Sequence, residues 1–169
     1  FGINSFIFFR GYGLDLDKVG TEFIWKAPDG SEVLAIYEKN SYGHFSCLGF
    51  DAIWGNFKNI KPDEKKALER LTKQFEDLSK YANTEHILFS NGCDHVPPQK
   101  ELPDLLKYLN KNQNKIKVIH SNFPDLLKSI KPYKDTFKSF SGELISGKYD
   151  FILLGVYSTR MYLKQLNYY

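Results

Sequence analysis

Short apolar runs alternate along this chain with longer segments whose apolar residues recur at helical spacing, and this alternation limits the fold more than any other feature. Residues 5–9 are nearly all apolar and stop at Arg10-Gly11-Tyr12-Gly13. A short run that is apolar on both faces is typical of a strand buried within a parallel sheet. Alternating strands and helices predict an α/β fold with a mostly parallel sheet. Further strands are predicted at residues 85–90, 117–120, 143–145 and 151–155.

A β-hairpin is predicted directly after the first strand. Glu22–Lys26 and Glu32–Tyr37 have strand character, and the turn signal Pro28-Asp29-Gly30 separates them. Proline suits the first turn of a helix, where its missing N–H loses no hydrogen bond, and serine suits the capping position before it. Helices are therefore predicted to begin at Pro62, near Leu102, at Pro124, and at Thr159 with Ser158 as its cap.

A long loop is predicted at residues 38–59, which are rich in Asn, Ser and Gly and have no clean period. Loops of this length in compact domains are usually functional or disordered. Aromatic residues make up 16% of the chain, and their presence in this loop argues against disorder. A thick core explains the aromatic content best, and a sugar-binding cleft is the second explanation. The loop aromatics are Tyr42, Phe45, Phe50, Trp54 and Phe57.

Charge and cysteine content exclude several classes of protein. The net charge is +3 with acidic and basic residues interspersed, so no basic stripe is present to neutralise nucleic-acid phosphates. No apolar run is long enough to cross a bilayer. The two cysteines, Cys47 and Cys93, are too few for a disulfide scaffold and favour free thiols. With no leader-like sequence at the start, we expect a cytoplasmic protein, and both ends look cut from a longer chain.

Three segments follow predicted strands, where ligands bind in α/β proteins. They are Arg10–Gly13, Ser90–His95 and His120–Asn122. Asp94 is the one carboxylate of the middle segment and the natural acid/base candidate. About equal weight goes to the alternative that Asp94 forms an Asx turn before the two prolines that follow.

The other polar residues of these segments carry weaker signals. His95 could bind a metal, but a hydrogen-bonded neighbour of the site is the favoured interpretation. Arg10 could clamp an anion or form a salt bridge at the rim. His120 is assigned to capping or packing, and Cys93 to the wall of the site. The four histidines lack metal-ligand spacing, so no metal site is predicted within the chain.

Several motifs together resemble the bacterial branch of glycoside hydrolase family 38, the α-mannosidases. They occur in the family's order and cover nearly the whole chain; "NG-x-DH-x-x-x-Q" and "SxRMYLKQ" are the most specific patterns. The matching stretches are "GINSFIFFRGYG", "EFIWKAPDGSEVLAIY", "LFSNGCDHVPPQKELPDLLKYLN", "HSNFPDLLKSIK", "GEL" and "GVYSTRMYLKQLN".

The resemblance implies that residues 1–169 are one segment of the N-terminal catalytic domain, with 158–169 leading into a helical region. The fold would be part of an irregular seven-stranded α/β barrel with an inserted hairpin. The reaction would be retaining hydrolysis of terminal α-mannosidic bonds, with Asp94 as acid/base. Arg10 would contact the nucleophilic aspartate, and Tyr42 and His95 would lie near the sugar. The aspartate nucleophile and the ligands of a catalytic Zn²⁺ would lie outside this chain.

A retaining glycosidase needs one carboxyl that holds its proton near neutral pH, and a strand end beside Val96 could supply the apolar surroundings that Asp94 needs for this. The expected partner is a mannose-containing oligosaccharide rather than nucleic acid or membrane, and a homo-oligomer is left open. The 169 residues alone are expected to hydrolyse nothing. The alternatives are another carbohydrate-active barrel enzyme of the deacetylase type and a non-catalytic sugar-binding module.

Overall fold

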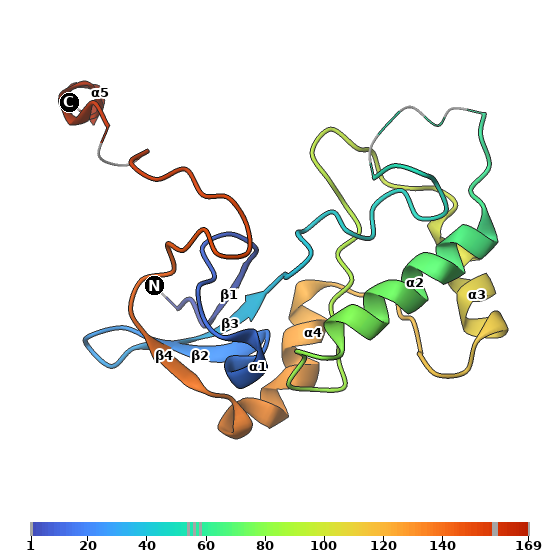
Figure 1. Cartoon of the computed structure of the whole chain (residues 1–169), viewed down its shortest axis with the longest axis horizontal. Helices are drawn as coiled ribbons and strands as arrows, with labels where there is room; N and C mark the ends of the chain where they lie inside the picture. The colour runs from blue at the N-terminus through green and yellow to red at the C-terminus, as the bar shows by residue number, and fades with distance from the viewer. Residues whose placement is uncertain (1, 54, 56, 58, 157–158, 169) are drawn as a thin grey trace.

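A computed structural model describes residues 2–53, 55, 57, 59–156 and 159–168, which form a mixed α/β structure. A four-stranded open sheet lies on one side and the helices α2 and α3 on the other (Figure 1). The strand order is β1–β3–β2–β4; β1 pairs with β3 and β2 with β4 in parallel, whereas β2 and β3 are antiparallel. The strands are β1 (Ser5–Phe8), β2 (Glu22–Lys26), β3 (Glu32–Tyr37) and β4 (Ser139–Ser141).

The predicted α/β class, the mostly parallel pairing and the inserted hairpin are confirmed. The hairpin turn is closed by Ala27, whose N–H donates to the carbonyl of Ser31 at 2.9 Å. Asp29 accepts from the Ser31 N–H at 2.9 Å, and Gly30 adopts φ 86°, a left-handed conformation that favours glycine. The seven-stranded barrel stays a prediction, since the strands of the described residues form a sheet that does not close.

Predicted and observed helices agree in position and differ at their ends. Pro62 lies outside its helix, because Asp63 is the N-cap and accepts from the N–H groups of Lys65 and Lys66. The short helix α1 and the 3-10 helix η1 were not predicted. Ser158, the predicted cap of the last helix, lies outside the described residues. The helices are α1 (Leu16–Val19), α2 (Glu64–Leu78), α3 (Leu102–Asn112), α4 (Phe123–Ile130), η1 (Lys131–Thr136) and α5 (Met161–Tyr168).

Four predicted strands are wrong: residues 85–90, 117–120, 143–145 and 151–155 have no strand conformation. An apolar run becomes a strand only where a neighbouring backbone pairs with it. In the described part of the chain these runs make isolated contacts instead. Val118 bonds to the side chain of Asn110, and Ser146 forms a single bridge with Gly11. Burial of β1 on both faces is also not observed, since Phe6 is 41% exposed.

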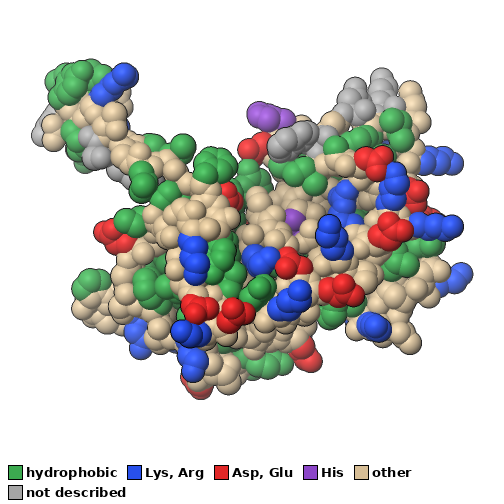
Figure 2. Space-filling view, viewed as in Figure 1, with side chains coloured by type: hydrophobic (Ala, Val, Ile, Leu, Met, Phe, Trp, Pro, Cys, Tyr) green, Lys and Arg blue, Asp and Glu red, His purple; other side chains and the backbone are tan. Residues whose placement is uncertain are grey.

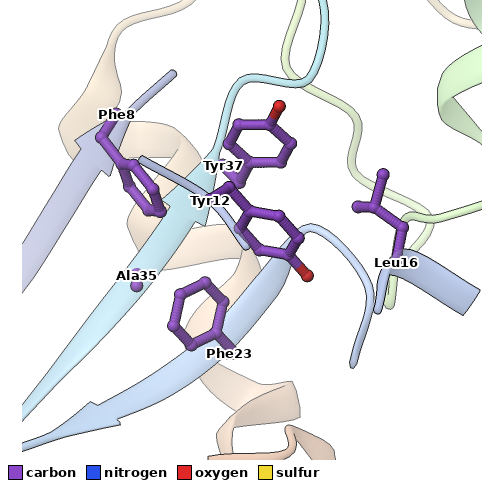
Figure 3. Close-up of a cluster of buried hydrophobic side chains, with 6 residues drawn as sticks. All are labelled: Phe8, Tyr12, Leu16, Phe23, Ala35 and Tyr37. Carbon is purple, nitrogen blue, oxygen red and sulfur yellow. The ribbon is translucent and has the colours of Figure 1, made fainter. Parts of the chain in front are cut away.

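In the described part of the chain, two separate hydrophobic clusters stabilise the structure. The first lies on the sheet, where Tyr12 is placed between Tyr37 and Phe23 (Figure 3). The Tyr12 and Tyr37 rings stack with centroids 4.2 Å apart, and the Tyr12 hydroxyl donates to the carbonyl of Gly20 at 2.7 Å. The second cluster joins α2 and α3 to the segment after β3, and consists of Phe45, Leu48, Ala67, Leu71, Leu105 and Leu109.

Residues 38–50 cross from the sheet to the helices and belong to both halves of the structure (Figure 1). Phe45 and Leu48 are buried in the helical cluster, so this part of the predicted loop is ordered by packing; Trp54 lies outside the described residues. Acidic and basic side chains are interspersed over the helical face, whereas many hydrophobic side chains are exposed on the projecting C-terminal segment that ends in α5 (Figure 2). Within the described residues, no helix combines the length and apolar character that crossing a membrane requires.

Candidate active site

The candidate site forms where the segment after β3 runs beside residues 90–94. The N–H of Phe45 donates to the carbonyl of Ser90 at 3.1 Å. Gly43 packs so closely on Cys93 that an added Cβ would lie 3.1 Å from its Sγ. The hydroxyl of Tyr42 donates to Oδ2 of Asp94 at 3.0 Å. These contacts place the two segments side by side and fix the predicted acid/base next to the end of the sheet.

In the Tyr42–Asp94 hydrogen bond the phenol is the donor and the carboxylate is the acceptor. Its carboxylate acceptor raises the pKa of the Tyr42 phenol, with smaller contributions from burial and from the charge of Asp94. The positive charge of Arg10 opposes this effect and lowers the same pKa. A phenol with a raised pKa stays protonated at neutral pH and remains a donor.

Aromatic contacts join this pair to Arg10 at the end of β1. The Phe9 ring meets the Tyr42 ring edge-on, with centroids 4.9 Å apart. The Arg10 guanidinium lies 4.9 Å from the Phe9 ring centroid and 4.0 Å from that of Phe151. Arg10 has no ion pair within the described residues, so the rim salt bridge is not observed and the guanidinium is held by aromatic faces.

Asp94 and His95 occupy the centre of a turn closed by the Val96 N–H, which donates to the carbonyl of Cys93 at 3.2 Å. His95 has φ 63°, an uncommon left-handed conformation for a residue with a side chain. Asp94 and His95 are exposed, so the apolar surroundings expected for Asp94 are not observed. The Asp94 carboxylate accepts from the Tyr42 hydroxyl, and within the described residues it does not form the Asx turn that was the alternative prediction.

The third predicted segment, His120–Asn122, has a structural role. The Asn122 side chain caps α4 by accepting from the N–H of Asp125 at 2.9 Å, and His120 is exposed. Capping of this kind stabilises the start of a helix. The structure therefore brings Arg10, Tyr42 and Asp94 together and leaves His120 outside the group.

The sequence interpretation assigned no role to three polar residues that hold the Asp94 segment, although Ser90 lies in the predicted segment Ser90–His95. Gln99 makes two 2.8 Å hydrogen bonds to the backbone of Leu48, accepting from its N–H and donating to its carbonyl. The Ser90 hydroxyl donates to Oε1 of Glu38, which is buried. Gln99 is the final residue of the "NG-x-DH-x-x-x-Q" pattern, which was a usable signal. Glu38 directly follows the predicted strand Glu32–Tyr37, but nothing in the local sequence pointed to Ser90, 52 positions away, as its partner.

The described residues do not fit a zinc site. No group of three or more His, Cys, Asp or Glu side chains in this part of the chain is arranged to hold a metal ion. Catalytic zinc requires three such protein ligands. Zinc in the intact parent protein thus stays a prediction.

Comparison with known proteins identifies the family. Residues 1–143 match the family described as "Glycosyl hydrolases family 38 N-terminal domain". The chain belongs to this family. Family 38 membership confirms the resemblance on which the assignment of Asp94 rests. It also supports the interpretation of the protein as a glycosidase.

Two further comparisons cover most of this chain. A protein of Halalkalibacterium halodurans named "Putative mannosylglycerate hydrolase" is 35% identical over 156 residues, which is 90% of this chain and 16% of that protein. The crystal structure of an alpha-mannosidase from Enterococcus faecalis V583 is similar with a TM-score of 0.67 and 25% identity, over 82% of this chain and 15% of that one. The chain thus spans about a sixth of each.

Proposed function

We propose that the protein containing this chain hydrolyses terminal α-mannosidic bonds with retention of configuration, and that Asp94 is its acid/base. The observation that carries the proposal is the Tyr42–Asp94 hydrogen bond, which holds a solvent-accessible carboxyl group beside the end of β1. Family 38 membership and the likeness to an alpha-mannosidase support the substrate class. The substrate is a mannose-containing oligosaccharide or glycoside.

Asp94 performs two proton transfers in this proposal. Its protonated carboxyl donates to the glycosidic oxygen as the bond to the leaving group breaks, and the resulting carboxylate then removes a proton from the water that releases the sugar. A second carboxylate, about 5 Å away on the other face of the sugar, forms the covalent intermediate. We assign that nucleophile to a part of the protein outside these 169 residues, so the chain alone is predicted to be inactive.

The leaving group distinguishes an acid/base from other essential residues. Cleavage of an α-linked mannobiose needs a proton on the departing oxygen, whereas 2,4-dinitrophenolate departs without one. In the full-length protein, Asp94→Asn should lower kcat/KM on mannobiose by about 10²–10⁴-fold and should change it far less on 2,4-dinitrophenyl α-mannoside. Asp104→Asn is the matched control, because Asp104 is an exposed carboxylate of α3 paired with Lys107.

Near wild-type hydrolysis of mannobiose by Asp94→Asn would remove the acid/base assignment. Proton NMR of the first-formed product tests retention separately, since a retaining enzyme releases the α-anomer of mannose. A wild-type protein that binds mannose without turnover would favour the sugar-binding module instead.

A further inference from the structure

The segment that carries Asp94 is anchored at Ser90, four residues earlier. The Ser90 hydroxyl donates to Oε1 of Glu38, and the Ser90 carbonyl accepts from the Phe45 N–H at 3.1 Å. Both groups of Ser90 are therefore bound to the segment that follows β3. Since residues 91–94 extend from this point to Asp94, the position of Ser90 sets where that segment begins.

Glu38 is itself firmly placed. It is the first residue after β3, and its N–H donates to the carbonyl of Phe8 in β1 at 2.7 Å. Only 9% of Glu38 is exposed, and burial raises the pKa of its carboxyl, an effect partly offset by the hydrogen bond from Ser90. A buried carboxyl costs free energy unless a partner compensates it. Its hydrogen-bond partner within the described structure is Ser90, which indicates a role beyond packing.

A small cavity of about 20 Å³ borders Glu38. That volume holds about one water molecule. His44 also lines it, and Nε2 of His44 is buried without a hydrogen-bond partner in the described part of the chain. Nδ1 of His44 contacts the carbonyl of Ser41 at 2.6 Å, next to Tyr42. The other titratable groups lining the cavity are Glu22, Tyr37 and Lys39, and the Lys39 ammonium is paired with Asp77 at 2.7 Å.

We propose that Glu38 is a positioning residue for the acid/base, and that it acts through the hydroxyl of Ser90. The inference rests on the proposed role of Asp94. The sheet fixes Glu38, Glu38 fixes Ser90, and Ser90 fixes the start of the segment whose carboxyl must meet the glycosidic oxygen. A displacement of about 1 Å at a reacting group can lower a rate by roughly 100-fold, so loss of this anchor slows proton donation.

The test uses four variants of the full-length protein: Ser90→Ala, Glu38→Ala, their double variant, and Glu38→Gln. Ser90→Ala and Glu38→Ala should each lower kcat/KM on mannobiose about 10- to 100-fold while changing it far less on 2,4-dinitrophenyl α-mannoside. The double variant should be no less active than the poorer single variant, because each single variant already removes the same contact between Glu38 and Ser90. Glu38→Gln should restore most of the rate, since its amide oxygen still accepts from Ser90.

Ser129→Ala is the control for hydroxyl removal, because the Ser129 hydroxyl bonds within α4 to the carbonyl of Asp125. An equal loss on both substrates would overturn the proposal, because a folding defect does not depend on the leaving group. So would additive losses in the double variant or no recovery with Glu38→Gln. If Asp94→Asn is selectively impaired while Ser90→Ala is not, the positioning role fails and the acid/base assignment stands. If Asp94→Asn is fully active, the proposed function fails first.

Discussion

The hydroxyl of Tyr42 and the carboxylate of Asp94 meet at 3.0 Å although the two residues are 52 positions apart in the chain. Tyr42 comes from the segment that leaves the sheet, and Asp94 from the segment that returns from α2. Their contact therefore depends on the packing of the two halves of the structure, and it links the candidate acid/base to the end of β1. Two parts of Tyr42 make separate contacts: the ring packs on Phe9, and the hydroxyl donates a hydrogen bond to Asp94.

Tyr42→Phe should lower kcat/KM on mannobiose by about 10- to 150-fold, because a hydrogen bond to a charged group contributes roughly 1.5–3 kcal/mol and the ring contact with Phe9 is kept. Thermal unfolding should change little, since the hydroxyl lies at the surface of the site. Tyr133→Phe is the matched control, because its hydroxyl also faces a carboxylate, that of Glu85 at 3.4 Å. An activity equal to wild type in Tyr42→Phe would show that the contact does not assist Asp94.

Gln99→Ala should destabilise the helical half by about 2–3 kcal/mol. The substitution leaves both the N–H and the carbonyl of Leu48 without partners, and Leu48 is fully buried. Gln99→Glu should also be destabilising, because a carboxylate accepts from the N–H and cannot donate to the carbonyl. Urea unfolding followed by a probe in α2 or α3 measures the effect. Gln113→Ala is the comparison variant, because Gln113 makes the same two kinds of bond to the backbone of Ile116, three residues away. If Gln99→Ala and Gln113→Ala unfold at the same urea midpoint, the bonds to buried Leu48 contribute no more than local bonds do.

Gly11→Ala should destabilise the sheet end by more than about 1 kcal/mol. Gly11 adopts φ 95°, and an added Cβ would lie 2.1 Å from the carbonyl oxygen of Leu144. The backbone of residues 144–146 must then move away, which breaks the bridge between Gly11 and Ser146. Gly30→Ala is the matched control, since Gly30 also has positive φ but open space around it. If both variants have the same unfolding midpoint, backbone strain alone decides the effect and the contact with Leu144 does not matter.

Local sequence patterns correctly predicted the elements that depend on residues close together in the chain. The turn at Pro28-Asp29-Gly30 fixed the hairpin, and apolar spacing located α2, α3 and α4 within two residues of their observed starts. Strands depend on partners elsewhere in the chain, and a local apolar pattern does not show whether such a partner exists. The runs at 85–90 and 151–155 were therefore wrongly predicted to be strands. The strand β4 was not predicted for the same reason, because it forms only through its parallel pairing with β2.

The candidate site was predictable where chemistry and position coincided. Asp94 is the carboxylate of a segment after an apolar run, and Arg10 follows β1, so both could be proposed from the sequence. The roles of Ser90 and Glu38 could not, because their contact spans 52 positions and each residue type is common in loops. His95 was placed near the site, yet its left-handed backbone and exposed ring follow from the turn after Cys93 rather than from residue type.

Glu22→Gln should stabilise the protein at pH 7 and have less effect near pH 4.5. Glu22 is buried, and burial raises its pKa above the ordinary value of 4.5, although hydrogen bonds from the N–H of Asn83 and the hydroxyl of Thr21 oppose the shift. Between pH 4.5 and the raised pKa the folded state binds more protons than the unfolded state. The free energy of unfolding therefore falls as pH rises through this window. The glutamine side chain of the variant is uncharged at every pH and still accepts from Asn83, so the variant loses this dependence. The prediction is checked by measuring melting temperatures from pH 4.5 to 7 for wild type, Glu22→Gln and the exposed control Glu69→Gln. If the increase in melting temperature of Glu22→Gln over wild type does not grow with pH, a buried charge at Glu22 is contradicted.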